Sequence, residues 1–162
     1  MKNIIYLLIV LTCFFSCKKE TPKTFSEEAL NDTFITLKGD SIQFRDILEE
    51  HKGKTLVLDI WASWCSDCIK GMPKVKVLQG NFKDPTYIFL SLDKSQESWK
   101  NGIQKYNVLG KHYFMQSDWK GPFGSFLELD WIPRYMIVDP EGNIKVFKAV
   151  EADDNKLIEA LK

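Results

Sequence analysis

Hydrophobic positions along the chain follow two spacings, and each spacing predicts a different kind of element. Short, nearly unbroken apolar or β-branched runs predict strands at residues 33–37, 54–61, 86–92, 112–116, 134–138 and 143–148. Helical spacing predicts helices after a short strand within residues 41–51, and over residues 69–82, 96–106, 121–129 and 153–162. Asp93 and Ser95 are predicted to cap the helix over residues 96–106. Strands that alternate with helices predict parallel pairing through right-handed crossovers.

A turn between the last two predicted strands makes the expected sheet mixed. The segment Asp139–Gly142 reads Asp-Pro-Glu-Gly, which is typical of turns that join neighbouring antiparallel strands. Short strands predicted before residue 54 add further members to the sheet. The predicted fold class is therefore α/β, with a central mixed sheet flanked by helices and extra N-terminal strands.

The first residues of the chain form a separate pattern. Residues 1–3 give a basic start, and the apolar run Ile4–Phe15 is short for a membrane-spanning helix, which needs about 20 apolar residues. The run ends at a serine before Cys17, and this arrangement resembles a bacterial lipoprotein signal. The resemblance implies that residues 1–16 are removed and that Cys17 carries lipid, with Cys13 as a second candidate.

These observations divide the chain into three expected parts. They are a signal peptide over residues 1–16, a lipidated tether over residues 17–30 and one folded domain over residues 31–162. The lipid would attach the protein to a bilayer. The expected location is therefore the bacterial cell envelope, on the side that faces the periplasm.

Composition excludes some functions and isolates one pair of residues. Lys+Arg and Asp+Glu both number 22, so the formal net charge is zero, and a nucleic-acid partner is not expected. Of the 4 cysteines, only Cys65 and Cys68 would remain as thiols in the folded domain. In an exported protein, an isolated close pair predicts a small disulfide or a redox cycle.

Cys65 and Cys68 follow a buried strand and open a predicted helix. Free amide groups at a helix N-terminus stabilise a thiolate at Cys65, so Cys65 is the predicted nucleophile and Cys68 the predicted resolving thiol. Zinc is an alternative, but it takes four ligands, and His51 and His112 lack ligand-like spacing to the pair. A structural disulfide is another alternative, although closing so short a loop removes little chain entropy.

Asp59 interrupts the apolar strand that leads to Cys65. Alternation along a strand places Val57, Asp59 and Trp61 on one face. Burial disfavours an ionised carboxylate, so we expect a raised pKa for Asp59 and a role as proton acceptor. The alternative is an acid that a local hydrogen bond satisfies and that has no catalytic role.

The segment Trp61–Cys68, with the sequence WASWCSDC, resembles the active-site motif of the thioredoxin superfamily. Asp59, Pro73 and the pair Ile132-Pro133 stand in the order that this family shows. The resemblance implies a thioredoxin-like fold, a buried base at Asp59, an active-site helix kinked at Pro73, and a cis peptide bond before Pro133 beside the cysteines. It also implies that the backbone of Ile132 pairs with an extended substrate.

The signal, the strands before Asp59 and the segment Ser91–Trp99 further resemble the TlpA/ResA-like branch of the superfamily. Its members are membrane-tethered thiol-disulfide oxidoreductases of the cell envelope. This resemblance implies a thiol-disulfide oxidoreductase with two partners, a disulfide-containing protein and a membrane electron-donor protein, and with no bound cofactor. Gly71 departs from some members, which have a glutamate there.

Five residues are expected to border the substrate groove or to tune the redox pair: Trp64, Ser66, Asp67, Ile132 and Pro133. Disulfide oxidants of the superfamily often carry histidine at the position of Asp67. Because an anion there disfavours the thiolate, Asp67 predicts a reducing pair.

Three other functions on this fold remain open. A peroxiredoxin-like peroxidase would need its nucleophile in another motif, beside a threonine and an arginine. A copper-binding module would pair the thiols with a histidine, for which His112 is the candidate. A redox-silent binding module would leave the disulfide unreactive.

Overall fold

The structure, a computed structural model, describes residues 20–162. The expected signal peptide, Cys13 and Cys17 lie outside the described residues. The strands are β1 (Thr33–Thr36), β2 (Ser41–Gln43), β3 (Leu56–Trp61), β4 (Thr86–Ser91), β5 (Lys111–Met115), β6 (Arg134–Val138) and β7 (Ile144–Ala149). The helices are α1 (Glu27–Leu30), α2 (Phe44–Glu50), α3 (Ser66–Asn81), α4 (Gln96–Tyr106), α5 (Pro122–Phe126) and α6 (Asn155–Ala160).

The strands form one mixed sheet in the order β2-β1-β5-β4-β3-β6-β7. β3, β4 and β5 are parallel to one another, whereas β6 is antiparallel to β3 and β7 is antiparallel to β6. The hairpin of β1 and β2 pairs with the outer edge of β5. The predicted mixed α/β fold with extra N-terminal strands is therefore confirmed.

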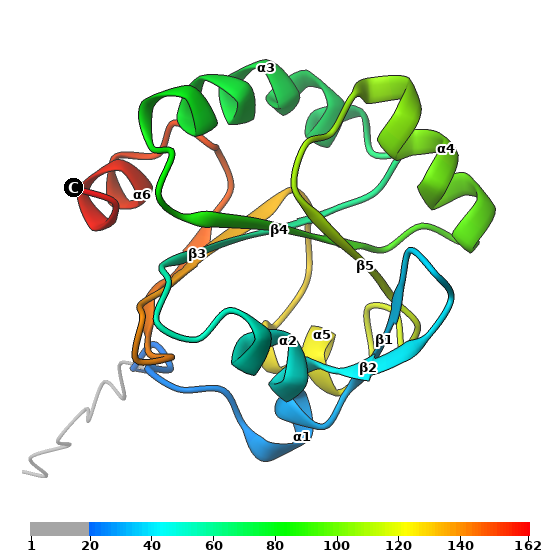
Figure 1. The fold of residues 1–162 in the computed structure, drawn as a ribbon, viewed down its shortest axis with the longest axis horizontal. Helices are drawn as coiled ribbons and strands as arrows, with labels where there is room; N and C mark the ends of the chain where they lie inside the picture. Colours follow the sequence, from blue (N-terminus) through cyan, green and yellow to red (C-terminus); the bar gives the residue numbers. More distant parts are fainter. Residues whose placement is uncertain (1–19) are drawn as a thin grey trace, which may run out of the picture.

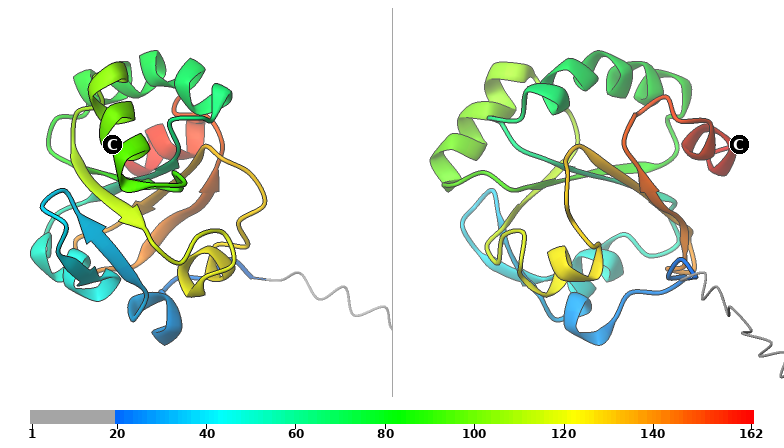
Figure 2. Two further views of the ribbon diagram at one scale, coloured as in Figure 1. Left: turned by 90° about the vertical axis from the view of Figure 1, so that its right-hand side faces the viewer. Right: turned by 180° about the vertical axis from the view of Figure 1, so that it is seen from behind.

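Helices cover both faces of the sheet (Figures 1 and 2). α3 and α4 lie on one face, and α1, α2 and α5 lie on the other. α6 shares a cavity wall with α3. β3 runs through the middle of this arrangement, and all six of its residues are buried, as an apolar run inside a parallel sheet requires. Among residues 20–162, no helix is long and apolar enough to cross a membrane.

The folded domain begins earlier than predicted. Phe25 is only 8% exposed, and its ring packs against those of Phe44 and Phe123, with centroids 4.9 and 6.2 Å apart. Burying an aromatic ring of this size contributes about 1.5–3 kcal/mol. The last residues of the expected tether over residues 17–30 therefore belong to the core, because one large apolar side chain there has a place to pack.

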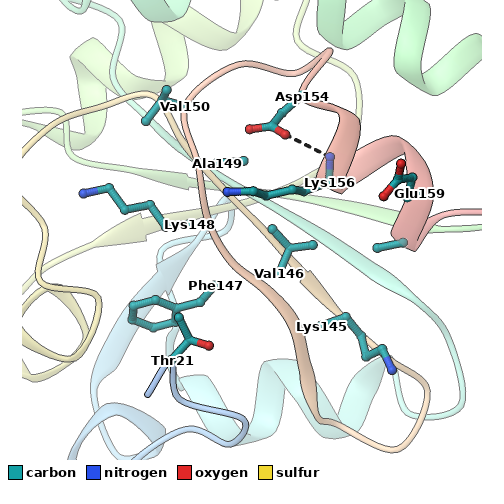
Figure 3. A pocket seen from close by; sticks show the side chains of 11 residues that line it. Thr21, Lys145, Val146, Phe147, Lys148, Ala149, Val150, Asp154, Lys156 and Glu159 are labelled. Atoms are coloured by element: carbon teal, nitrogen blue, oxygen red, sulfur yellow. Dashed lines mark hydrogen bonds between the residues drawn. The ribbon is translucent and has the colours of Figure 1, made fainter. Parts of the chain in front are cut away.

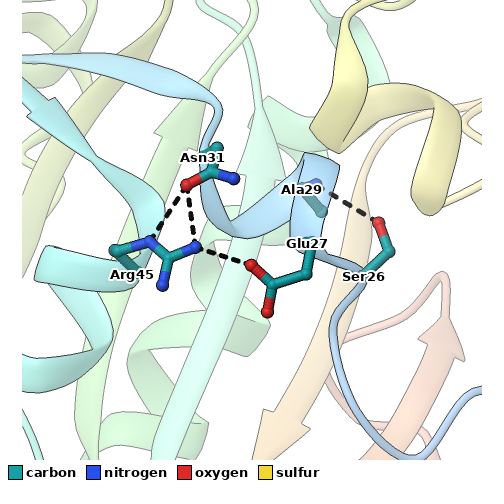
Figure 4. Close-up of polar contacts among 5 residues, drawn as sticks. All are labelled: Ser26, Glu27, Ala29, Asn31 and Arg45. Carbon is teal, nitrogen blue, oxygen red and sulfur yellow. Dashed lines mark hydrogen bonds and ion pairs between the residues drawn. The ribbon is translucent and has the colours of Figure 1, made fainter.

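Polar contacts fasten the same segment to α2 (Figure 4). The Ser26 hydroxyl caps α1 by accepting a hydrogen bond from the Ala29 amide at 3.2 Å. The Arg45 guanidinium donates to Asn31 Oδ1 at 2.7 and 3.1 Å and to Glu27 Oε2 at 2.9 Å. The contacts of Arg45 are exposed, so the apolar burial of the neighbouring segment contributes more of the stability.

Candidate active site

Cys65 and Cys68 stand at the beginning of α3 and are joined by a disulfide bond. Cys65 is the N-terminal cap of the helix: its backbone is extended, and its Sγ accepts a hydrogen bond from the Cys68 amide at 3.1 Å. A helix N-terminus has amide groups without carbonyl partners, and these stabilise an anion. Cys65 is 6% exposed and Cys68 is 1% exposed, so the predicted nucleophile is the more accessible sulfur.

Asp59 lies inside β3, between Phe89 of β4 and Tyr135 of β6. It is 3% exposed, and neither carboxylate oxygen has a hydrogen-bond partner among the described residues. Burial raises the pKa of Asp59 to about 8, so the predicted direction of the shift is confirmed. Trp61, on the same strand face, reaches Gly102 of α4. Asp59 therefore faces the side of the sheet that α3 and α4 cover.

Tyr135 pairs directly with Asp59 in the sheet register and is 1% exposed. Burial, followed by the negative charge of Asp59, raises the pKa of the Tyr135 hydroxyl far above its ordinary value. A Cβ placed on Gly71 of α3 would lie 3.5 Å from this hydroxyl. Gly71, where some relatives of this motif have a glutamate, therefore brings α3 close to the strand pair that holds Asp59.

His112 lies two strands away from Asp59, with Phe89 between them. Its ring stacks on Phe89 with centroids 5.3 Å apart, and its Nε2 lies 3.1 Å from the Val108 carbonyl oxygen. Burial lowers the pKa of His112, which favours the neutral ring. Across residues 20–162, no group of three or more His, Cys, Asp or Glu side chains is arranged to hold a metal ion.

The loop before β6 forms the opposite wall of the site. The peptide bond between Ile132 and Pro133 is cis, which confirms that prediction. The carbonyl oxygen of Ile132 lies 3.6 Å from Cys65 Sγ. Two residues that are 67 positions apart in the sequence, Cys65 and Ile132, thus meet beside the disulfide.

A groove of about 330 Å³ opens beside Cys65. Its lining residues are Trp64, Cys65, Ser66, Asp67, Trp119, Asp130, Trp131 and Ile132. Two of its walls are exposed indole rings, those of Trp64 and Trp131, with 51% and 58% of their surfaces exposed. Trp64 is held by its indole N–H, which donates to the Leu92 carbonyl at 3.3 Å. The groove thus contains four of the five predicted border residues, whereas Pro133 does not line it.

A larger cavity, of about 850 Å³, lies between β7 and α6 (Figure 3). Lys145, Lys148 and Lys156 are among its lining residues, and no cysteine borders it. This cavity is larger than the groove beside Cys65, but the groove is the better candidate for the active site, because it borders the Cys65–Cys68 disulfide.

Asp93 is a supporting residue whose role the sequence did not reveal. Asp93 and Ser95 were both predicted to cap α4, but in the structure the cap is Ser95 alone, whose hydroxyl accepts a hydrogen bond from the Ser98 amide. Asp93 instead accepts hydrogen bonds from the Ser63 amide at 3.1 Å and the Ser63 hydroxyl at 2.6 Å. The Ser91 hydroxyl donates to it at 2.8 Å. Asp93 thereby fixes the loop that leads into the cysteines.

Asp67 lies in the first turn of α3 and lines the groove. Its carboxylate is 3.4 Å from Lys70 Nζ, and the two side chains are 46% and 77% exposed. An exposed pair of this kind is worth about 0–1 kcal/mol. Lys70 therefore offsets only part of the negative charge that Asp67 places near Cys65.

A family model described as Thioredoxin-like matches residues 53–144, which include Asp59, both cysteines and Pro133. The chain belongs to the thioredoxin-like family. ResA, a thiol-disulfide oxidoreductase of Bacillus thuringiensis subsp. konkukian, is 26% identical over 140 residues, which cover 85% of this chain and 76% of ResA. The thioredoxin-like protein YneN of Bacillus subtilis is 26% identical over 132 residues, covering 79% and 73%.

Solved structures agree with the sequence relatives of this thioredoxin-like chain. The thioredoxin domain of a thiol-disulfide oxidoreductase from Bacteroides vulgatus aligns with a TM-score of 0.67 and 28% identity, covering 86% of this chain and all of that one. A thiol:disulfide interchange protein from Bacteroides sp. aligns with a TM-score of 0.66 and 29% identity, covering 86% and 88%. Together with the Cys65–Cys68 pair, these likenesses identify a thiol-disulfide oxidoreductase of the TlpA/ResA-like kind.

Proposed function

We propose that this oxidoreductase reduces disulfide bonds in other proteins of the cell envelope. Cys65 thiolate attacks one sulfur of a substrate disulfide, and the other substrate sulfur leaves as a thiolate. Cys68 thiolate then attacks Cys65 Sγ and displaces the second substrate thiolate. Two electrons pass to the substrate, and the Cys65–Cys68 disulfide remains. The observation that supports this most directly is the disulfide at the cap of α3, beside the Ile132 carbonyl.

Asp59 is the proposed base of the second step. Cys68 is 1% exposed, so its proton cannot pass readily to bulk water. Asp59 faces the same layer of helices, and its pKa of about 8 matches a group that takes up a proton near neutral pH. A water molecule can complete the path between the two groups.

The charge of Asp67 supports reduction rather than oxidation. Asp67 lines the groove beside Cys65. Its carboxylate disfavours the Cys65 thiolate, so it raises the free energy of the reduced pair relative to the disulfide. A dithiol pair whose free energy falls when it is oxidised to the disulfide acts as a reductant. Its re-reduction is assigned to an electron-donor protein in the membrane.

Attachment of the protein to a bilayer through Cys17 fits the position of the first described residues. The Lys23 carbonyl accepts a hydrogen bond from the Ile144 amide at 2.7 Å. Ile144 pairs with Val138, which pairs with Leu56 at the start of β3, whereas Cys65 follows the end of β3. An anchor at Cys17 would therefore hold the sheet by the end opposite the cysteines and leave the groove open to proteins of the periplasm.

A trapping experiment tests the proposed reaction. Cys68→Ser, expressed in native envelopes, should accumulate proteins disulfide-linked to Cys65, which mass spectrometry would identify. Cys65→Ser is the matched control, since it keeps one thiol but lacks the proposed nucleophile. Equal yields of linked proteins from the two variants, together with no reduction of insulin by the wild type, would refute the reductase function.

Fractionation tests the anchor separately. Cys17→Ser should move the protein from the membrane fraction to the soluble fraction or leave its signal peptide uncleaved. Cys13→Ser is the control and should leave the protein in the membrane fraction. Membrane retention and normal processing of Cys17→Ser would show that Cys17 does not carry the lipid.

A further inference from the structure

Arg134 is a fully buried cation at the edge of the active site. It follows Pro133 directly and is 0% exposed. Taking a guanidinium out of water costs several kcal/mol unless hydrogen bonds and an opposite charge compensate. Its pKa is lowered by this burial. A residue held at such a cost needs partners, and these partners indicate what the side chain does.

Both partners of Arg134 belong to the segment that leads to the groove. Nη1 donates to the Leu127 carbonyl at 2.7 Å, and Nη2 donates to Asp130 Oδ1 at 2.9 Å. Asp130 also lies 3.5 Å from Lys148 Nζ of β7, and both of those side chains are at least half exposed. The buried contact of Arg134 with Leu127 and its partly buried contact with Asp130 therefore fasten the segment, whereas the contact between Asp130 and Lys148 is a weak surface pair.

The fastened segment presents Trp131 and Ile132 to Cys65. Both residues line the groove, and Ile132 contributes the carbonyl oxygen 3.6 Å from Cys65 Sγ. Leu127 and Leu129 are buried as well, but apolar contacts have no direction and can tolerate rotation or sliding. The planar guanidinium, by contrast, fixes two acceptors in one orientation.

We propose that Arg134 is a positioning residue that sets the backbone of Trp131 and Ile132 against Cys65, so that disulfides within extended polypeptides react in preference to small disulfides. This inference rests on the proposed function, in which Cys65 attacks the substrate. An extended peptide must lie along Ile132 while its sulfur meets Cys65. A small disulfide needs only access to Cys65, so its reaction does not depend on the position of Ile132.

The test compares two substrates with the full chain in its reduced form. One is a peptide pair joined by a disulfide, and the other is hydroxyethyl disulfide. Arg134→Met should lower the second-order rate constant of the single-turnover reaction with the peptide about 10- to 100-fold, mainly through weaker binding of the peptide, because a shift of about 1 Å has effects of this size. The rate with hydroxyethyl disulfide should stay within about twofold. Arg134→Lys should give an intermediate loss, since lysine supplies a point charge without the planar fork.

Two further substitutions serve as controls. Lys148→Met removes the exposed cation from the same carboxylate, and Arg45→Met removes an arginine that binds Asn31 and Glu27 away from the groove. Neither should change the ratio of the two rates by more than about twofold. If Arg134→Met does not fold, Asp130→Asn keeps the test available, because it weakens one acceptor and leaves the guanidinium in place.

Equal losses with both substrates, or no loss with the peptide, would overturn the role of Arg134. A selective loss with the peptide, graded from Met to Lys, would support it, because a general weakening of the fold would slow both reactions. Cys65→Ser separates the two proposals. If that variant abolishes both reactions, the proposed function holds whatever the Arg134 variants show.

Discussion

Asp59 in the interior of β3 and Asp93, two residues after the end of β4, are both buried carboxylates, with 3% and 5% exposure. They differ in their hydrogen bonds. Asp93 accepts hydrogen bonds from the amide and hydroxyl of Ser63 and from the Ser91 hydroxyl. Neither oxygen of Asp59 has a partner among residues 20–162.

The difference shows how one residue type serves two purposes beside one disulfide. A carboxylate with several donors is fixed in place, and it fixes the segments that carry those donors. A carboxylate without donors in an apolar strand stays protonated at a pH where an exposed acid would ionise. Asp93 therefore positions the loop before the cysteines, whereas Asp59 has the raised pKa that suits its proposed role as a proton acceptor.

The largest expected effect is on the pH dependence of stability. The pKa of Asp59 is about 8 in the folded chain and about 3.9 when exposed, so between these values the folded state holds a proton that the unfolded state has lost. This group therefore makes stability fall by up to about 1.4 kcal/mol per pH unit as pH rises from about 4 to 8. Denaturant unfolding of the oxidised protein across this range measures the slope.

Asp59→Asn isolates that contribution, because the amide does not titrate. The free energy of unfolding of the variant, compared with that of the wild type, should rise steadily with pH. Asp84→Asn, a change at an exposed acid, is the control and should leave the slope unchanged. Parallel curves for the wild type and Asp59→Asn would contradict the raised pKa of Asp59.

The same substitution should slow the chemistry of the second step. General base catalysis contributes at least about 100-fold, so Asp59→Asn should release substrate from the mixed disulfide about 100-fold more slowly at pH 7. Quenched-flow analysis of the mixed disulfide measures this rate. Alkylation of Cys65 in the same variant is the internal control and should change far less. If both rates fall together, Asp59 is not a base specific to Cys68.

Removing Asp93 should affect the structure more than the proton transfer. Asp93→Ala leaves the Ser63 and Ser91 groups without their acceptor, which should cost about 1–3 kcal/mol of folding free energy. Asp84→Ala should change stability by less than about 0.5 kcal/mol. Chemical denaturation gives both values. If Asp93→Ala lowered the catalytic rate without lowering the free energy of unfolding, Asp93 would act in the reaction, as proposed for Asp59, and not in holding the loop.

The smallest expected effect concerns Asp67, an acid that is exposed and paired with Lys70. Charges near a helix terminus are worth about 0.3–1 kcal/mol, which corresponds to about 6–20 mV for a two-electron couple. Asp67→Asn should raise the reduction potential by this amount in equilibration against glutathione. Glu97→Gln, in the first turn of α4, is the control and should have no effect. A lower potential in Asp67→Asn would reverse the assigned direction of electron flow.

Local sequence patterns predicted the elements whose structure depends mainly on residues close to them in the sequence. The apolar run of β3 marked a buried strand, and the spacing of Cys65 and Cys68 marked a helix cap with two thiols of unequal exposure. The segment around Phe25 was misassigned, because a single apolar residue among polar ones carries no periodic signal.

The sequence by itself determined the fold class, the redox pair and the acid within β3, because strand burial and helix capping depend on neighbouring residues. Only the tertiary structure decided which carboxylate is partnered. Asp93 meets Ser63 from 30 positions away, and Ile132 meets Cys65 across 67. Arg134 likewise acquired its role from the segment that folds against it. Contacts between distant residues depend on how the elements pack, and no local pattern encodes that geometry.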